Sequence, residues 1–148
     1  MNERFEMFTV LMAKIRRNIQ RIKTEEMAEY DLKSPHVSCL YYLYVHESLT
    51  ATELCEICYE DKAAISRSLD QLEKRGYVEY AQGAKKHYRA GIVLTELGKS
   101  VAKGVADKVN KYIDLIGGEL GEKERLIFYK TLSAISKNLE KVCESYDK

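Results

Sequence analysis

The chain has 148 residues, of which 45% are hydrophobic and 32% charged, with a formal net charge of +1. This length and balance predict one folded domain, or one domain with helical extensions, and exclude a disordered or low-complexity chain. No segment approaches the roughly 18 apolar residues of a membrane span, and four scattered cysteines are too few for a disulfide scaffold. We therefore expect a cytoplasmic protein with reduced thiols and no membrane partner.

The first predicted element is an amphipathic helix at the N-terminus. Apolar residues alternate there at spacings of three and four, which places them on one side of a helix: Phe5, Phe8, Met12, Ile15, Ile19 and Ile22. Two similar helices follow nearer the C-terminus. The middle of the chain is too small to cover all three faces, so packing against a second copy is favoured. Folding of the three helices onto one another is the alternative.

A compact lobe is predicted over residues 34–96. Ser34 as a capping residue, followed by the only proline of the chain, predicts a helix that ends near Glu47. Thr50 or Thr52 is expected to cap the short helix that comes next. A third helix follows after a turn.

The third helix, which starts near Asp61, has two sides of different character. Ile65, Leu69 and Leu72 are spaced at i, i+4 and i+7, so their side belongs to the core. Gly76 is expected to end the helix as a left-handed cap. The opposite side carries small and basic residues that permit close approach to a groove: Lys62, Ala63, Ser66, Arg67, Asp70 and Lys74.

Two short strands are expected after this helix. Residues 77–80 are β formers, Gly83 and Ala84 make a turn, and His87 to Leu94 returns as the second strand. Thr95 is expected to cap the next helix. Helices and a hairpin in this order predict a mainly α fold with a small β-hairpin, in which a winged helix-turn-helix is flanked by N- and C-terminal dimerisation helices.

The segment LTATELCEICYEDKAAISRSLDQLEKRGYVEY, followed by a basic turn and IVLTELGKSV, resembles the MarR family of bacterial transcriptional regulators. The resemblance covers nearly the whole chain, because the flanking helices match the family's dimerisation helices in length and order. It implies one MarR-like domain over 1–148, with dimerisation helices in 1–30 and 97–148. It also implies a homodimer that binds double-stranded DNA at a pseudo-palindromic operator, generally as a repressor released by a small ligand.

Two groups of residues are predicted to contact DNA. The resemblance maps the family's contacts to Thr52, Lys62, Ala63, Ala64, Ser66 and Arg67. The residues themselves add a local positive charge that the whole chain lacks, carried by Lys74, Arg75, Lys85, Lys86, His87 and Arg89. A favourable interaction with the helix dipole is the alternative for the first two of these, and a solvated turn for the others.

The wing departs from the family's pattern. The family often carries an Asp-x-Arg pair there, where this chain has Lys86 and Tyr88, with Arg89 one residue away. A basic wing still predicts phosphate or minor-groove contact, and which side chain enters the groove stays open.

A small-molecule effector is implied by the resemblance, between the dimerisation helices and the lobe. Tyr30, His36, Tyr41 and Tyr44 are the candidates for lining that cleft. Their alternative role is an aromatic core with satisfied hydroxyl groups.

Other chemistry has less support. Cys55 and Cys58 form a CxxC, but both fall where a helix-turn-helix buries small or apolar residues, and no second CxxC or HxxxH completes a zinc site. A site assembled across the dimer from His36, Cys39, His46 and Glu47 stays as an alternative. No GxSxG, P-loop or dinucleotide motif is present, so we expect no enzyme, no cofactor and no metal. The competing functions are a metal- or thiol-responsive regulator of the same fold and a winged-helix protein-interaction module without an operator.

Overall fold

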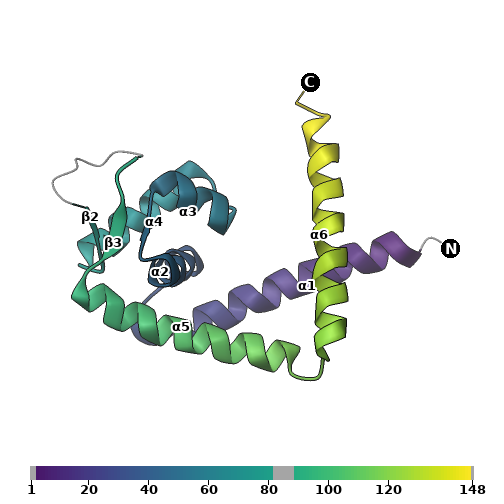
Figure 1. The fold of residues 1–148 in the computed structure, drawn as a ribbon, viewed down its shortest axis with the longest axis horizontal. Helices are drawn as coiled ribbons and strands as arrows, with labels where there is room; N and C mark the ends of the chain where they lie inside the picture. Colours follow the sequence, from purple (N-terminus) through teal and green to yellow (C-terminus); the bar gives the residue numbers. More distant parts are fainter. Residues whose placement is uncertain (1–2, 82–88, 148) are drawn as a thin grey trace. The chain divides into compact units, whose positions relative to one another are not determined.

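The computed structural model describes residues 3–81 and 89–147 and shows a mainly helical chain with one small antiparallel sheet, which confirms the predicted fold class (Figure 1). The chain divides into two compact units, Met1–Val109 and Asn110–Lys148. No helix in the described ranges is long and apolar enough to cross a membrane. The elements are α1 (Glu3–Glu26), the 3-10 helix η1 (Ala28–Tyr30), α2 (Ser34–His46), β1 (Ser48–Leu49), α3 (Ala51–Cys58), α4 (Lys62–Lys74), β2 (Val78–Tyr80), β3 (Ile92–Leu94), α5 (Glu96–Gly117) and α6 (Glu122–Glu144).

The core of the first unit forms where α2, α3 and α4 meet (Figure 1). Each helix turns one apolar side inward, and the buried side chains on these three helices include Val37, Leu40, Leu43, Leu54, Ile65, Leu69 and Leu72. Full burial of such a side chain stabilises the fold by roughly 1.5–3 kcal/mol relative to an exposed one. The predicted core side of α4 is therefore confirmed, and its burial decides which side of α4 stays outside.

Two side-chain caps fix the starts of α3 and α4. The backbone N–H of Glu53 donates to the Thr50 hydroxyl oxygen at 3.2 Å, and the N–H of Thr50 donates to Glu53 Oε2 at 2.7 Å. The N–H of Ala64 donates to Asp61 Oδ1 at 2.7 Å. Thr50 is therefore the cap of α3, while Thr52 lies exposed in its first turn.

A left-handed glycine ends α4, as predicted. Gly76 has a φ of +73°, its N–H donates to the Glu73 carbonyl at 2.8 Å, and the next N–H donates to the Leu72 carbonyl at 2.9 Å. The predicted cap Thr95 is also confirmed, because its hydroxyl oxygen accepts the N–H of Gly98 at 3.0 Å. The same hydroxyl donates to the carbonyl of Gly76, which joins the end of α4 to the start of α5.

The sheet has three strands in the order β1-β3-β2, and both neighbouring pairs are antiparallel. β2 and β3 form the predicted hairpin, in which Val78 lies opposite Leu94 and Tyr80 opposite Ile92. β1 was not predicted, because a strand of two residues has no alternation that a sequence pattern can reveal.

The second strand of the hairpin is shorter than predicted. A strand from His87 to Leu94 is wrong in its described part, since residues 89 and 90 form a turn and a bend and β3 begins at Ile92. Alanine and glycine, at positions 90 and 91, have low strand propensity. The turn predicted at Gly83 and Ala84 lies outside the described residues.

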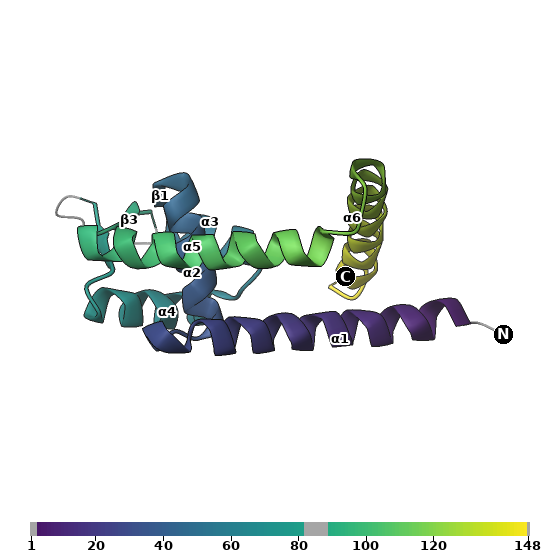
Figure 2. The same cartoon turned by 90° about the horizontal axis from the view of Figure 1, so that it is seen from below.

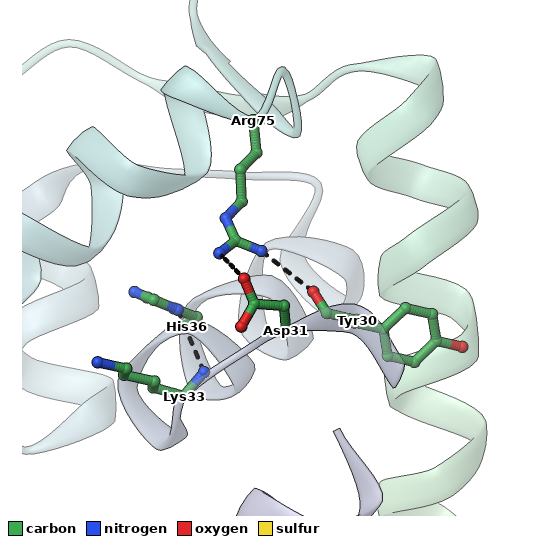
Figure 3. Close-up of polar contacts among 5 residues, drawn as sticks. All are labelled: Tyr30, Asp31, Lys33, His36 and Arg75. Atoms are coloured by element: carbon green, nitrogen blue, oxygen red, sulfur yellow. Dashed lines mark hydrogen bonds and ion pairs between the residues drawn. The ribbon is translucent and has the colours of Figure 1, made fainter. Parts of the chain in front are cut away.

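The start of α2 differs from the prediction that Ser34 caps it. Ser34 is the first helical residue, and Lys33 precedes it in an extended conformation with φ −99° and ψ 161°. The N–H of Lys33 donates to Nδ1 of His36 at 3.2 Å, so the imidazole satisfies a backbone donor at the helix start (Figure 3). Burial, followed by the nearby Arg75 and Lys33, lowers the pKa of His36, and Asp31 offsets part of this.

The terminal helices are present as predicted, and each keeps apolar side chains on the surface of the single chain. In α1 these are Met7, Val10, Leu11, Met12, Ile15 and Ile19. In α6 they are Leu126, Ile127, Phe128, Tyr129, Leu139 and Val142. Exposed apolar surface of this extent is typical of an interaction site.

Gly98→Ala should destabilise the first unit. Gly98 lies so close to the Tyr77 carbonyl that an added Cβ would overlap backbone atoms. We expect the free energy of unfolding in urea to fall by about 1–3 kcal/mol. Gly117→Ala in the same helix is the matched control, since its Cβ would meet only the Arg125 side chain at 3.9 Å. An equal loss in both variants would contradict the close contact at Gly98.

The stability of the chain should depend on the protonation of His36. Because its pKa is lowered on folding, the unfolded chain binds the proton more readily. The free energy of unfolding should therefore fall as the pH drops below about 6.5, until the lower pKa of the folded state is passed. His36→Gln should remove that part of the pH dependence in urea titrations, and His46→Gln at the exposed end of α2 should retain it. If both variants behave alike, His36 does not have this role.

Candidate nucleic-acid interface

α4 carries small and basic side chains opposite its core residues. We call Lys62, Ala63, Ser66 and Arg67 the recognition face, and all four are exposed. The alanine and the serine project little beyond the backbone, so a bound molecule can come close enough to meet the two bases. Ala64, predicted as a further contact, is half-buried at the edge of this face.

The two serines of α4 have different surroundings. Ser68 is buried, and its hydroxyl donates to the carbonyl of Ala64 at 2.9 Å. That hydroxyl is satisfied inside the helix. Ser66 is exposed, so of the two hydroxyl groups it is the one available to a partner.

The turn before α4 adds a residue that sequence patterns did not reveal. Tyr59 follows α3 with a left-handed backbone at φ 51°, and it is 86% exposed. Tyrosine hydroxyl groups are among the donors that contact phosphate oxygens. The predicted contact Thr52 is exposed at the other end of α3. Tyrosine has no preference for the left-handed region, so the sequence does not indicate this turn, and Tyr59 was missed.

Lys74 and Arg75 are both predicted DNA contacts, but they differ in exposure and in their partners within the chain. Lys74 is exposed, whereas Arg75 is half-buried. Arg75 Nη2 donates to Asp31 Oδ2 at 2.8 Å, and Nη1 donates to the Tyr30 carbonyl at 3.1 Å (Figure 3). The structure therefore gives Arg75 partners within the chain.

A hollow of about 650 Å³ lies beside the recognition face, between the start of α2 and α4. Basic side chains outnumber acidic ones in its lining: Lys33, His36, Arg67, Lys74 and Arg75 against Asp31 and Asp70. Such local charge attracts a polyanion even when the whole chain is nearly neutral.

The wing is described only in part. Arg89 is exposed in the turn before β3. Lys85, Lys86 and His87 lie outside the described residues, so their predicted contacts stay predictions.

The four candidates for an effector site lie at separate places. His36 lines the basic hollow, whereas Tyr44 lines a second hollow of about 790 Å³ beside β3. Tyr30 packs against the core, and Tyr41 packs edge to face on Tyr42 with 5.3 Å between ring centroids. Neither hollow is lined by all four side chains, and the location of an effector stays a prediction.

The thiol that contacts Cys58 is Cys39 rather than Cys55, its neighbour in the CxxC pattern. Cys39 is wholly buried, while Cys55 and Cys58 pack against the core but are only half-buried. A hydrogen bond between the thiols of Cys39 and Cys58 raises the pKa of Cys39 and lowers the pKa of Cys58. Within residues 3–81 and 89–147, no three His, Cys, Asp or Glu side chains are grouped as a metal site requires.

Comparisons with known proteins agree with this architecture. The model of the MarR family matches residues 30–87. An HTH-type transcriptional regulator of Bacillus cereus is 27% identical over 122 residues, which are 82% of this chain and 81% of that protein. The structure of NMB1585, a MarR family regulator from Neisseria meningitidis, has a TM-score of 0.84 at 22% identity and covers all of both chains. The S. aureus MepR–DNA complex has a TM-score of 0.79 at 19% identity, over 89% of this chain and 96% of that one.

The segment matched by the family model includes α2, α3 and α4, and therefore the recognition face. The similarity in fold extends over the flanking helices as well. Members of this family are regulators rather than enzymes. Over residues 30–87 the chain is therefore similar to the MarR family of transcriptional regulators, and its fold is that of MarR family structures.

Proposed function

We propose that the chain binds specific DNA sequences as a homodimer and regulates transcription from them. The observation that carries this proposal is the recognition face, which is exposed and rich in small and basic residues on a helix whose other side is buried. A helix of this kind enters the major groove and reads base edges through side chains near its N-terminus. Direct contacts are proposed for Thr52, Lys62, Ala63, Ala64, Ser66, Arg67 and Lys74, with support from Lys85, Lys86, His87 and Arg89 of the wing.

The proposed dimer rests on the apolar surfaces of the terminal helices. Ile15 and Ile19 of α1 are 45% and 40% exposed, and Phe128 of α6 is 48% exposed. A second copy of the chain is the partner that would bury the same surfaces in both protomers. Two recognition helices related by a two-fold axis would enter successive major grooves about 10–10.5 base pairs apart. The operator is therefore a pseudo-palindrome with that half-site spacing.

The mode of regulation is proposed by analogy with the family. A repressor bound to such an operator in the cytoplasm would exclude polymerase from the promoter. A small ligand would release it only if the ligand binds two dimer geometries with different affinities.

A protein-interaction module is the competing function, in which the basic surface binds an acidic protein. The two functions differ in their dependence on salt. Contact with several phosphates releases counterions, so the affinity for a duplex should fall steeply between low and moderate salt. In a selection from random duplexes, a regulator would enrich particular sequences. A protein-interaction module would enrich no sequence.

The purified chain should be a dimer at micromolar concentration. Light scattering should give twice the 17.1 kDa mass of one chain. Ile15→Glu would place a charge in the proposed apolar interface and should shift the mass toward that of one chain. Gln20→Glu adds the same charge at another exposed position of α1 and should leave the dimer intact. A monodisperse monomer of the parent chain would rule out the proposed assembly.

Arg67 and the wing should make different contributions to DNA binding. Arg67→Ala should reduce the difference in affinity between a selected palindrome and random DNA. A good base-edge contact contributes about 1–3 kcal/mol of discrimination between sequences. Lys86→Ala and Arg89→Ala should weaken binding to both duplexes about equally. Each should also lower the salt slope, which is the slope of log affinity against log salt concentration, by about one unit. Binding isotherms at several salt concentrations measure both effects. If Arg89→Ala abolishes discrimination and Arg67→Ala preserves it, the two roles are assigned wrongly.

A further inference from the structure

The end of α4 is attached to the rest of the first unit at two places. One is the junction at Gly76, where the Thr95 hydroxyl ties the carbonyl at the end of α4 to the start of α5. The second attachment is Arg75, whose guanidinium reaches the segment between α1 and α2 (Figure 3).

The bonds of Arg75 constrain the direction in which its side chain approaches the segment between α1 and α2. Arg75 donates from two nitrogens to two acceptors on consecutive residues, the carbonyl of Tyr30 and the carboxylate of Asp31. A planar guanidinium that makes two such bonds fixes an angle as well as a distance. The side chain of Arg75 is 29% exposed and that of Asp31 is 91% exposed, so water screens the pair and its contribution to stability is small. Its main effect is therefore on orientation.

The acceptors themselves are held in place. Asp31 has a left-handed backbone at φ 52°, and its N–H donates to the Ala28 carbonyl at 3.0 Å. The residues that flank this segment, Met27 and Leu32, are buried in the core. We call residues 27–32 the platform. The Arg75 guanidinium is therefore bound to a segment whose ends are fixed in the core.

The other side of the same platform is held by α5. Lys108 donates to the Glu26 carbonyl at 2.8 Å, pairs with Glu29, and lies 5.7 Å from the centre of the Tyr30 ring. The Tyr30 hydroxyl lies against Gly104, where an added Cβ would collide with it. The platform also follows directly on α1, whose C-terminal end packs on α2 (Figure 2). Arg75 thus connects α4 to the junction of α1 and α5.

We infer that Arg75 is a positioning residue, which sets the orientation of the recognition helix relative to α1 and α5 through its bonds to Tyr30 and Asp31. This inference rests on the proposed function, because α1 and α5 belong to the proposed dimer and their orientation to α4 would set the distance between two recognition helices. It replaces the predicted role of Arg75 as a DNA contact. Lys74, which is adjacent and exposed, keeps that role.

Asp31→Asn and Arg75→Lys test the inference with little risk to the fold. Asparagine tolerates the left-handed backbone of position 31, and lysine keeps the charge of position 75 but lacks the two-pronged geometry. Each variant should bind the selected palindrome about three- to tenfold more weakly. Its preference for the natural half-site spacing, over duplexes with a single base pair inserted or removed, should shrink. For Arg75→Lys, which keeps the charge of the hollow, binding to random duplex and the salt dependence of binding should stay unchanged, because no phosphate contact is lost.

Lys74→Gln is the matched control for a DNA contact. This variant should bind the palindrome and random duplex more weakly by the same factor, and its salt slope should fall by about one unit. Its preference for the natural half-site spacing should stay unchanged. A merely structural role of Arg75 would lower the melting temperature without changing the spacing preference. The inference is overturned if Arg75→Lys and Asp31→Asn keep the parent's spacing preference, or if Arg75→Gln behaves as Lys74→Gln does.

A distance measurement decides the inference without DNA. Nitroxide labels on cysteines introduced at Gln71 of α4 and Asp107 of α5 report the orientation by pulsed electron paramagnetic resonance. Cys55, Cys58 and Cys143 are replaced by serine in every sample, and labelled chains are diluted with unlabelled ones. The parent should give a narrow distance distribution, and Asp31→Asn should broaden or shift it. Equal distributions would overturn the positioning role. Failure of the parent to select any duplex, together with a broadened distribution in Asp31→Asn, would instead reject the proposed function alone.

Discussion

The burial of one side of α4 against α2 is the interaction on which the rest of the lobe depends. Ile65, Leu69 and Leu72 are almost wholly buried, and this fixes the rotation of the helix about its own axis. The recognition face is exposed as a direct consequence, because it occupies the opposite side. A polar substitution among the three core residues would bury a polar group and so lower the free energy of unfolding of the lobe that holds this face in place.

The charge of the protein matters locally rather than as a total. A net charge of +1 gives little long-range attraction to DNA, so the basic hollow beside α4 and the exposed bases of its recognition face must supply it. Asp31 lies in that hollow and neutralises Arg75. Arg75 is thereby bound within the chain, and Lys74 beside it is left exposed.

Local patterns in the sequence were sufficient to predict most of the fold. The spacing of Ile65, Leu69 and Leu72 predicted the two sides of α4, and Gly76 predicted its end, because both depend on residues within a few turns of one helix. The two-residue strand β1 and the left-handed Tyr59 were missed, since a strand of two residues has no alternation and tyrosine has no preference for a left-handed backbone. The bond between Arg75 and Asp31 was missed for another reason. It joins residues 44 positions apart, and only the packing of α4 on α2 brings them together.

Protection of guanine bases in a selected palindrome would show whether α4 reads the DNA sequence in the major groove. Dimethyl sulfate methylates guanine N7, which faces the major groove, where the recognition face is proposed to bind. We expect two protected clusters about 10–10.5 base pairs apart, and we expect the protection to be lost when Arg67 is replaced by alanine. A bound complex in which major-groove guanines stay fully reactive, or in which the alanine variant protects them as the parent does, would contradict the claim that α4 reads the DNA sequence.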